Sequence, residues 1–201
     1  MAAGDSRFGA AWETVLPAAQ AGAGWAFTRL FEAFGGPVAG YLRNQSVADP
    51  DGLANEVFLR VFRSMGSFTG TEEKFRSWLF TIAHNVLIDE RRRLGRRVAE
   101  TGVADIVDLR GAPVAVAAED EAMDEMAGER VTAMLAALVP DQRDVVTLRI
   151  VADMSLEDVA ATLGKSTGAV KQLQRRGLEA LRREIARTAV PQPADESFTS
   201  V

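Results

Sequence analysis

The sequence predicts an all-α protein of two helical domains joined by a flexible acidic linker. Apolar residues recur every three or four positions in several segments, a spacing that places them on one face of a helix. No segment shows the alternation of apolar and polar residues that is typical of a half-buried strand. The helical spacing stops over residues 98–128, where the sequence is acidic and rich in Ala. This interruption divides the 201 residues into two helical parts.

The first part follows a weakly periodic segment. Residues 1–21 are rich in Ala and Gly, and we expect them to form a mostly flexible N-terminal arm with a short helical turn near Trp12. Residues 22–97 are the first expected domain, with three helices whose apolar residues lie within 27–42, 53–65 and 75–87. Gly35-Gly36-Pro37 predicts a break or a kink in the first of these helices, because proline lacks the donor that a helix interior needs.

Local signals place the other two helices of this domain. Asp49 can cap a helix and Pro50 suits its first position, so the second helix is expected to begin there. The segment from Ser67 to Lys74 is polar and contains one glycine, which predicts a loop. The third helix ends in a basic run, residues 91–97, and cations suit the negative end of a helix dipole.

The second expected domain covers residues 129–188. Pro140 predicts the start of one helix, and Ser155 with Asp158 resembles the capping box that starts another. Gly164 is expected to end that helix and Ser166 to cap the last one. The polar tail, residues 189–201, is expected to be disordered.

Charge is distributed unevenly along the chain, although the net charge is only −5. Residues 60–97 hold nine basic and four acidic side chains, and residues 165–187 hold seven and two. Residues 100–130, between them, hold nine acidic and two basic side chains. Two basic modules flanking an acidic bridge indicate binding to a polyanion, because a polyanion responds to local charge.

The segment from Ser155 to Leu181 has the pattern of a helix-turn-helix: a helix, a short turn led by glycine, and a second helix. The second helix is rich in side chains that can donate to base edges: Lys171, Gln172, Gln174, Arg175 and Arg176. This pattern predicts that the second helix enters a major groove. An ordinary helical hairpin with a solvated basic face is the alternative.

Aromatic residues precede the basic run of the third helix. Phe68, Phe75, Trp78 and Phe80 lie within a short stretch, and of these Phe75 is expected to belong to the core. Aromatic rings beside a basic stripe suit single-stranded or unstacked bases. The alternative is a solvated helix end behind core aromatics.

Several classes of protein are excluded by what the sequence lacks. It has no cysteine, which excludes disulfides, thiol catalysis and zinc fingers, and its one histidine is His84. It has no apolar run of 18 residues and no secretory signal, so we expect a cytoplasmic protein without membrane insertion. No nucleophile, base and orienting group stand at a suggestive spacing, so we expect neither an enzyme nor a metal or other cofactor.

Two sets of motifs carry a family resemblance. In the first domain they are Leu53-Ala54-Asn55-Glu56-Val57-Phe58-Leu59-Arg60, and Phe75-Arg76-Ser77-Trp78-Leu79-Phe80-Thr81-Ile82-Ala83-His84-Asn85 with Asp89 and Arg91-Arg92 behind it. In the second they are Leu138-Val139-Pro140-Asp141-Gln142-Arg143, Ser155-Leu156-Glu157-Asp158-Val159-Ala160 and Leu163-Gly164-Lys165-Ser166-Thr167-Gly168-Ala169-Val170-Lys171. In this order the chain resembles a bacterial sigma factor of the extracytoplasmic-function (group 4) class of the sigma-70 family.

The resemblance implies a two-domain initiation factor that binds core RNA polymerase, at its clamp helices and flap, and promoter DNA. Region 2, residues 22–97, would contact polymerase through Asn55, Glu56, Leu59 and Arg60. It would open the minus-10 element through Phe68, Phe80, Asn85, Arg91 and Arg92. The resemblance places Phe80 and Asn85 in the family's pocket for a flipped non-template base, with Phe68 and the loop of residues 69–74 nearby. Region 4, residues 129–188, would read the minus-35 element through Ser166, Thr167, Lys171, Gln172, Arg175 and Arg176. An anti-sigma protein is a usual further partner in the family.

The chain departs from the family pattern at a few positions. Gly52 stands where Asp is usual and Asn55 where Gln is usual, both on the expected polymerase face. Gly168-Ala169-Val170 replaces the commoner Gly-Thr-Val. A helix-turn-helix regulator with a helical sensor domain is the runner-up interpretation, but such a sensor needs no stripe of aromatics and arginines.

Overall fold

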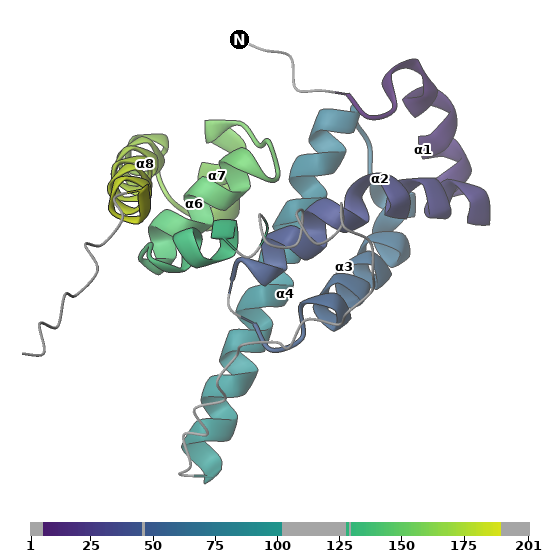
Figure 1. Cartoon of the computed structure of the whole chain (residues 1–201). Helices are drawn as coiled ribbons and strands as arrows, with labels where there is room; N and C mark the ends of the chain where they lie inside the picture. Colours follow the sequence, from purple (N-terminus) through teal and green to yellow (C-terminus); the bar gives the residue numbers. More distant parts are fainter. Residues whose placement is uncertain (1–5, 46, 102–127, 129, 190–201) are drawn as a thin grey trace, which may run out of the picture.

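The computed structural model describes residues 6–45, 47–101, 128 and 130–189. Within these residues the chain forms helices and connecting turns, and no strand, which confirms the predicted all-α class. In Figure 1 the long helix α4 lies between two groups of helices, α1 to α3 and α6 to α8. Of the linker expected over residues 98–128, residues 102–127 lie outside the described residues, and so does the expected tail from residue 190 onward.

The first module contains the helices from the N-terminus to α4. Asp49 caps α3 as predicted, since its carboxylate accepts from the Gly52 amide at 2.8 Å. The elements are η1 (Gly9–Ala11), α1 (Trp12–Gln20), α2 (Gly24–Arg43), α3 (Pro50–Ser64), η2 (Met65–Ser67) and α4 (Glu72–Thr101).

The expected flexible arm is wrong for the part of it that the structure describes. Trp12, Val15 and Ala19 of α1 are buried in the core of the first module, at the spacing of one helix face. Three apolar contacts are a weak signal within an Ala-rich and Gly-rich segment, but the buried indole adds much of the apolar area. The N-terminal segment is therefore a packed part of the first module.

Two further features of the first module concern the lengths of its helices. Of the break or kink expected at Gly35-Gly36-Pro37, a break is wrong: α2 runs through these residues, because Val38, Tyr41 and Leu42 beyond the proline are buried and hold the chain helical. The helix α4 continues to Thr101, four residues past residue 97, where the first domain is expected to end.

The second module comprises a short helical stretch over residues 130–136 and the helices α6 (Pro140–Ile150), α7 (Leu156–Leu163) and α8 (Thr167–Ala189). Arg143 of α6 donates to the carbonyls of Leu135, Ala136 and Leu138, at 2.9–3.1 Å, and so ties the short stretch to α6. These bonds satisfy carbonyls that the end of a helix leaves without partners.

The predicted signals of the helix-turn-helix are confirmed. The Ser155 hydroxyl accepts from the Asp158 amide at 3.0 Å and caps α7. Gly164 ends α7 in the left-handed conformation, with φ of 61°, which glycine adopts without steric cost. Ser166 caps α8 by accepting from the Ala169 amide at 3.2 Å.

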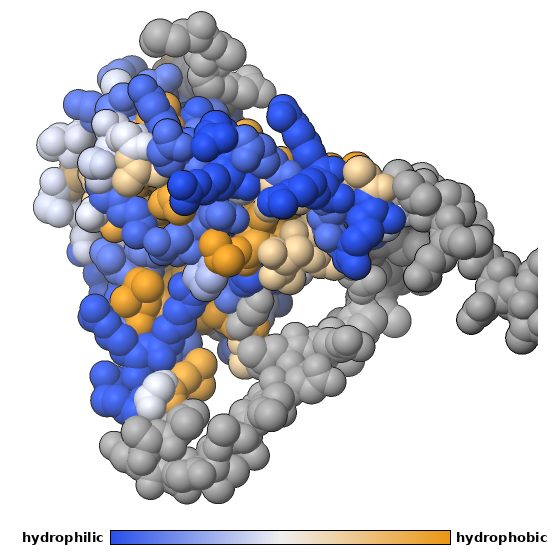
Figure 2. All heavy atoms as spheres, turned by 90° about the vertical axis from the view of Figure 1, so that its left-hand side faces the viewer, coloured by the Kyte–Doolittle hydropathy of each residue, from blue (hydrophilic) through white to orange (hydrophobic). Residues whose placement is uncertain are grey.

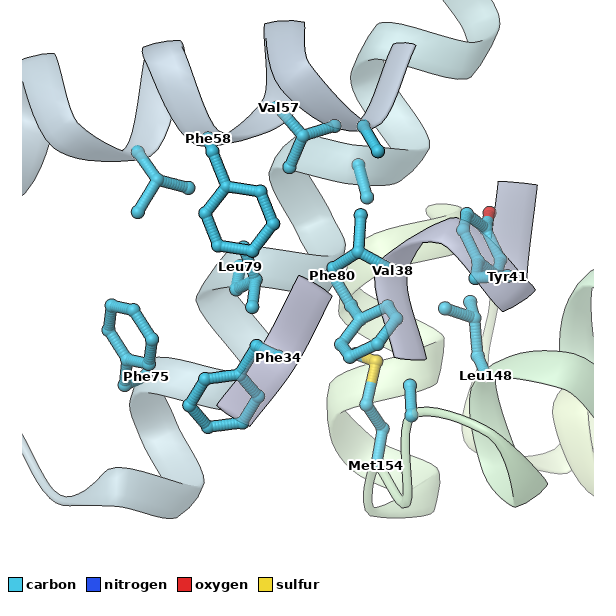
Figure 3. Close-up of a cluster of buried hydrophobic side chains, with 14 of the residues drawn as sticks. Phe34, Val38, Tyr41, Val57, Phe58, Phe75, Leu79, Phe80, Leu148 and Met154 are labelled. Carbon is cyan, nitrogen blue, oxygen red and sulfur yellow. The ribbon is translucent and has the colours of Figure 1, made fainter. Parts of the chain in front are cut away.

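The two modules share one hydrophobic core. Phe80 of α4 and Tyr41 of α2 are buried, with ring centroids 5.9 Å apart and rings nearly perpendicular. In Figure 3, Met154 of the second module points toward Phe80, and Leu148 lies below Tyr41. All four side chains are at most 1% exposed, so these residues form an apolar contact between the modules from which solvent is excluded.

Candidate nucleic-acid and polymerase interfaces

The helix α8 is held against α6 by a close approach at Gly177. A Cβ atom added to Gly177 would lie 2.7 Å from a methyl carbon of Val146, which is closer than real side chains allow. Gly177 and Val170 are buried on the inner side of α8. The opposite side of α8 is consequently turned away from the module.

That outer side carries the residues predicted to read the minus-35 element. All six are exposed: Ser166, Thr167, Lys171, Gln172, Arg175 and Arg176. The Arg175 guanidinium donates to Gln172 at 3.2 Å and to Glu179 at 2.8 Å. Figure 2 views the molecule from the side of α8 in Figure 1 and shows mainly hydrophilic residues there.

This face can perform direct readout. Arg and Lys side chains donate to the major-groove edge of guanine, and Gln pairs with adenine. Arg175 can leave its exposed ion pair with Glu179 and contact DNA at a small cost in free energy, because surface ion pairs contribute little to stability. The structure thus groups these six residues on one accessible helix end.

The first module arranges its predicted DNA contacts differently. Asn85 is exposed and lines a shallow hollow between α3 and α4, together with Arg60, Arg63, Ser64 and Ile82. An amide beside two guanidinium groups can bind a base edge and a neighbouring phosphate at once. Arg63 and Ser64 were not predicted from the sequence, although Arg63 follows Arg60 by about one turn of the same helix.

Phe80 does not join this hollow. Its side chain is 0% exposed and lies inside the core that the modules share, so the expectation that it lines a base pocket does not hold in this arrangement. Its position in the helix explains why: five residues separate Phe80 from Asn85, which places the two side chains on different sides of α4.

Phe68 belongs to the turn of residues 68–71, which precedes α4. Its ring extends along α4 to Trp78, which lies seven residues, or about 10 Å of helix, before Asn85. The Phe68 ring is 8% exposed and packs against Phe75 and Trp78, with centroid distances of 5.5 and 5.0 Å.

The two arginines of α4 that were predicted to contact DNA have separate environments. Arg91 is half-buried and donates to the Gln45 side chain at 2.9 Å, so it braces α4 against the end of α2. Arg92 is exposed. Of the two, Arg92 has the guanidinium turned to solvent, where a phosphate can reach it.

The residues predicted to contact polymerase lie on α3. Asn55 is exposed, and Leu59 is 49% exposed although it is apolar. Arg60 donates to Glu56 at 2.8 Å and to Asp89 of α4 at 3.0 Å, and these hydrogen bonds raise the pKa of its guanidinium. Arg60 thus links the expected polymerase face to the hollow around Asn85.

Polar contacts between the modules were not predicted from the sequence. Ser77 donates to Asp158 at 2.9 Å, and the Thr81 and Thr162 hydroxyls lie 2.8 Å apart. Arg76 pairs with Asp153 at 3.1 Å. Each contact joins residues more than 70 positions apart, so only the fold reveals it.

A polar cluster is buried beside these contacts. The Tyr41 hydroxyl and Nδ1 of His84 are 3.0 Å apart, and Asp144 of α6 and Arg91 act on both electrostatically. Burial raises the pKa of Tyr41 and of Asp144 and lowers the pKa of His84, because it disfavours each charged form. The one histidine of the chain is thus a buried partner of Tyr41.

The described part of the chain contains no cluster of three or more metal-ligating side chains. Among the same residues, no helix is both long enough and apolar enough to cross a membrane.

Comparisons with known proteins match both modules. The family profile described as "Sigma-70 region 2" matches residues 30–97, and "Sigma-70, region 4" matches residues 134–183. The ECF RNA polymerase sigma factor SigX of Bacillus subtilis is 32% identical over 139 residues, which cover 66% of this chain and 69% of SigX. The ECF RNA polymerase sigma factor BldN of Streptomyces coelicolor is 32% identical over 169 residues, or 82% of this chain. The chain spans 62% of the length of BldN.

A solved structure with the same fold is that of CnrH in complex with the cytosolic domain of CnrY. It superposes with a TM-score of 0.60 at 22% sequence identity, and the match covers 88% of this chain and 97% of CnrH. The likeness extends across both modules and supports the fold described above.

Proposed function

This chain belongs to the extracytoplasmic-function (ECF) sigma factors of the sigma-70 family, and we propose from this membership that it directs core RNA polymerase to specific promoters. The observation that carries the proposal is the helix-turn-helix of α7 and α8, whose exposed donors stand on the outer side of a module matched by region 4. The chain would lend sequence specificity to polymerase and would itself make or break no bond.

We assign the two modules different tasks. The second, residues 129–188, reads the duplex minus-35 element through α8: Lys171, Gln172, Arg175 and Arg176 face base edges. Ser166 and Thr167 suit phosphates, since they stand at a helix N-terminus. The first, residues 22–97, binds the polymerase clamp helices through the exposed side of α3.

The minus-10 element is assigned to two separate points on the first module. The hollow around Asn85 holds one base, and Arg60 and Arg63 neutralise phosphates beside it. The 68–71 turn meets the same strand at a second point, before the start of α4. Phe80 supports α4 from inside and contacts no base unless the modules separate.

The remaining partners follow from family membership. The factor acts in the cytoplasm, where its polymerase is, and an anti-sigma protein is included among its partners because one is usual in the family. The comparison structure of CnrH also contains a second chain, the cytosolic domain of CnrY.

Run-off transcription tests the proposal. Purified protein is added to core polymerase from the source bacterium on a library of genomic promoters, and transcripts that depend on the protein are counted. We expect a discrete set of start sites that share two spaced elements. A protein that binds DNA but recruits no core polymerase, in the assay and by co-purification, would instead be the helix-turn-helix regulator considered above.

A further inference from the structure

The N-terminal segment is attached to the beginning of α4 by one carboxylate. Glu72, the first residue of α4, is only 9% exposed. Its oxygens accept from the Ser6 hydroxyl at 2.5 Å and from the amides of Arg7, Phe8 and Gly9 at 2.6, 3.1 and 3.3 Å. Four donors on one buried carboxylate fix the chain before α1 against the end of α4, because charge-assisted hydrogen bonds are the stronger kind.

The helix α1 then contacts the 68–71 turn directly. The indole Nε1 of Trp12 donates to the Gly70 carbonyl at 3.0 Å, and the amide Nε2 of Gln20 donates to the Phe68 carbonyl at 2.7 Å. The two donors lie at the first and last residues of α1, so the turn is held at two points by one rigid element.

The inner and outer sides of this turn differ. On the inner side, the Phe68 ring packs between Phe75 and Trp78. Gly70 has φ of 146°, which other residues rarely adopt, and a Cβ there would lie 3.2 Å from the side chain of Lys74. On the outer side, Thr69, Gly70 and Thr71 are exposed. The backbone of the turn is thus fixed from within while its polar side chains face solvent.

We infer that the N-terminal helix α1 positions the 68–71 turn and thereby sets which base the turn prefers in the minus-10 element. Trp12 and Gln20 are the positioning residues, and Glu72 anchors the segment that carries them. This inference rests on the proposed function, since it assumes that the turn meets the non-template strand. A preformed turn discriminates between bases because a wrong base leaves its donors and acceptors without partners.

The test measures base preference with the full chain bound to core polymerase. Single-stranded non-template minus-10 oligonucleotides carry each of the four bases at each position, and their affinities are measured for the wild type and four variants. Thr69→Ala, on the exposed side of the turn, identifies the position that the turn reads. Trp12→Phe removes the indole donor but keeps a ring against Phe75, and Gln20→Met removes the amide donor from an exposed side chain. Glu13→Gln, on the exposed side of α1, is the matched control.

At the position that Thr69→Ala identifies, we compare the affinity for the best base with the affinity for the worst base. We expect this ratio to fall about fivefold in Trp12→Phe and about threefold in Gln20→Met, because each variant loses one hydrogen bond to the turn. Glu13→Gln should keep the ratio, and all variants should keep their affinity for minus-35 duplex. A general loss of packing would weaken all four bases alike, so the ratio separates positioning from folding.

The inference would be overturned if Gln20→Met and Trp12→Phe kept the wild-type ratio of best to worst base while Thr69→Ala changed the base preference at one position. That result would leave the proposed function standing. A wild-type complex with no base preference at any minus-10 position would count against the proposed function itself. If Trp12→Phe lowers the helical content measured by circular dichroism, the test of the inference depends on Gln20→Met alone, because the Gln20 side chain is exposed and its replacement does not disturb the core.

Discussion

The helices α8 and α4 carry the expected DNA contacts in opposite ways. On α8, all six predicted residues are exposed at one end of the helix. On α4 and the turn before it, Phe68 and Phe80 are buried, Arg91 is half-buried, and Asn85 and Arg92 are exposed. The difference matches the two tasks: a duplex groove needs a protruding row of donors, whereas an unstacked base needs a shaped surface supported from behind.

The comparison also shows how α4 serves the fold. Ser77 and Thr81 of α4 contact Asp158 and Thr162 of α7, and Phe80 packs into the core between the modules. The helix that is expected to contact melted DNA is therefore also the one that joins the two modules. On α8, by contrast, the reading face and the packing face are on opposite sides.

The largest difference should appear in stability. Phe80→Ala should lower the free energy of unfolding by about 3–5 kcal/mol, because it removes a buried ring and leaves a cavity in the shared core. Arg176→Ala, on the exposed face of α8, should change it by less than about 0.5 kcal/mol. Urea denaturation followed by circular dichroism measures both. A loss below about 1 kcal/mol for Phe80→Ala would mean that the two modules do not share this core in solution.

The next effect concerns DNA binding by α8. Lys171→Ala should cost about 1–3 kcal/mol of affinity for the preferred minus-35 duplex and relax the preference at one base pair, if the side chain reads a base edge. A phosphate contact would weaken all sequences alike and reduce the salt dependence instead. Titrations with duplexes mutated at each position, at two salt concentrations, distinguish these results. Unchanged affinity for every duplex would remove Lys171 from the reading face.

A smaller effect is expected from the polar contact between the modules. Thr81→Val removes a hydroxyl that donates to the Ser77 carbonyl and lies 2.8 Å from Thr162, which should lower the free energy of unfolding by about 0.5–1.5 kcal/mol. The matched control is Thr28→Val, since Thr28 is exposed and bonds only within its own helix. Equal effects for the two variants would show that the contact with Thr162 adds no stability.

The smallest predicted effect is a dependence on pH. Burial lowers the pKa of His84 below its ordinary 6.5, so the unfolded chain binds the proton more readily. The stability contributed by His84 is therefore complete above pH 6.5 and decreases as the pH falls through that value. Asp144, whose pKa burial raises from 3.8, opposes this trend. His84→Gln should reduce the loss of stability between about pH 7.5 and about pH 5.5. Identical profiles for His84→Gln and the wild type would contradict a neutral buried histidine.

The sequence predicted what depends on local signals. Asp49, Ser155 and Gly164 mark helix ends by their own chemistry, and the structure places helix ends at all three. The donors on α8 were predictable because helical spacing alone decides which side chains share its outer side. The break predicted at Pro37 is wrong because a local signal was not decisive there. Burial of residues around Val38 outweighs the hydrogen bond that proline removes.

What the sequence could not supply are contacts between distant segments. Residues 6–20 seemed a flexible arm because nothing local shows that Trp12 and Gln20 meet carbonyls of the 68–71 turn.

Permanganate footprinting of the melted region on one promoter tests most directly whether α8 reads duplex and α4 stabilises melted DNA. Holoenzymes containing wild type, Asn85→Ala or Lys171→Ala are compared at concentrations that saturate the promoter, with folding of each variant verified by circular dichroism. At full occupancy, Asn85→Ala should show reduced thymine reactivity in the bubble, whereas Lys171→Ala should match the wild type, because its defect lies in binding. Normal reactivity in Asn85→Ala, or a loss confined to Lys171→Ala, would contradict this division between the two helices.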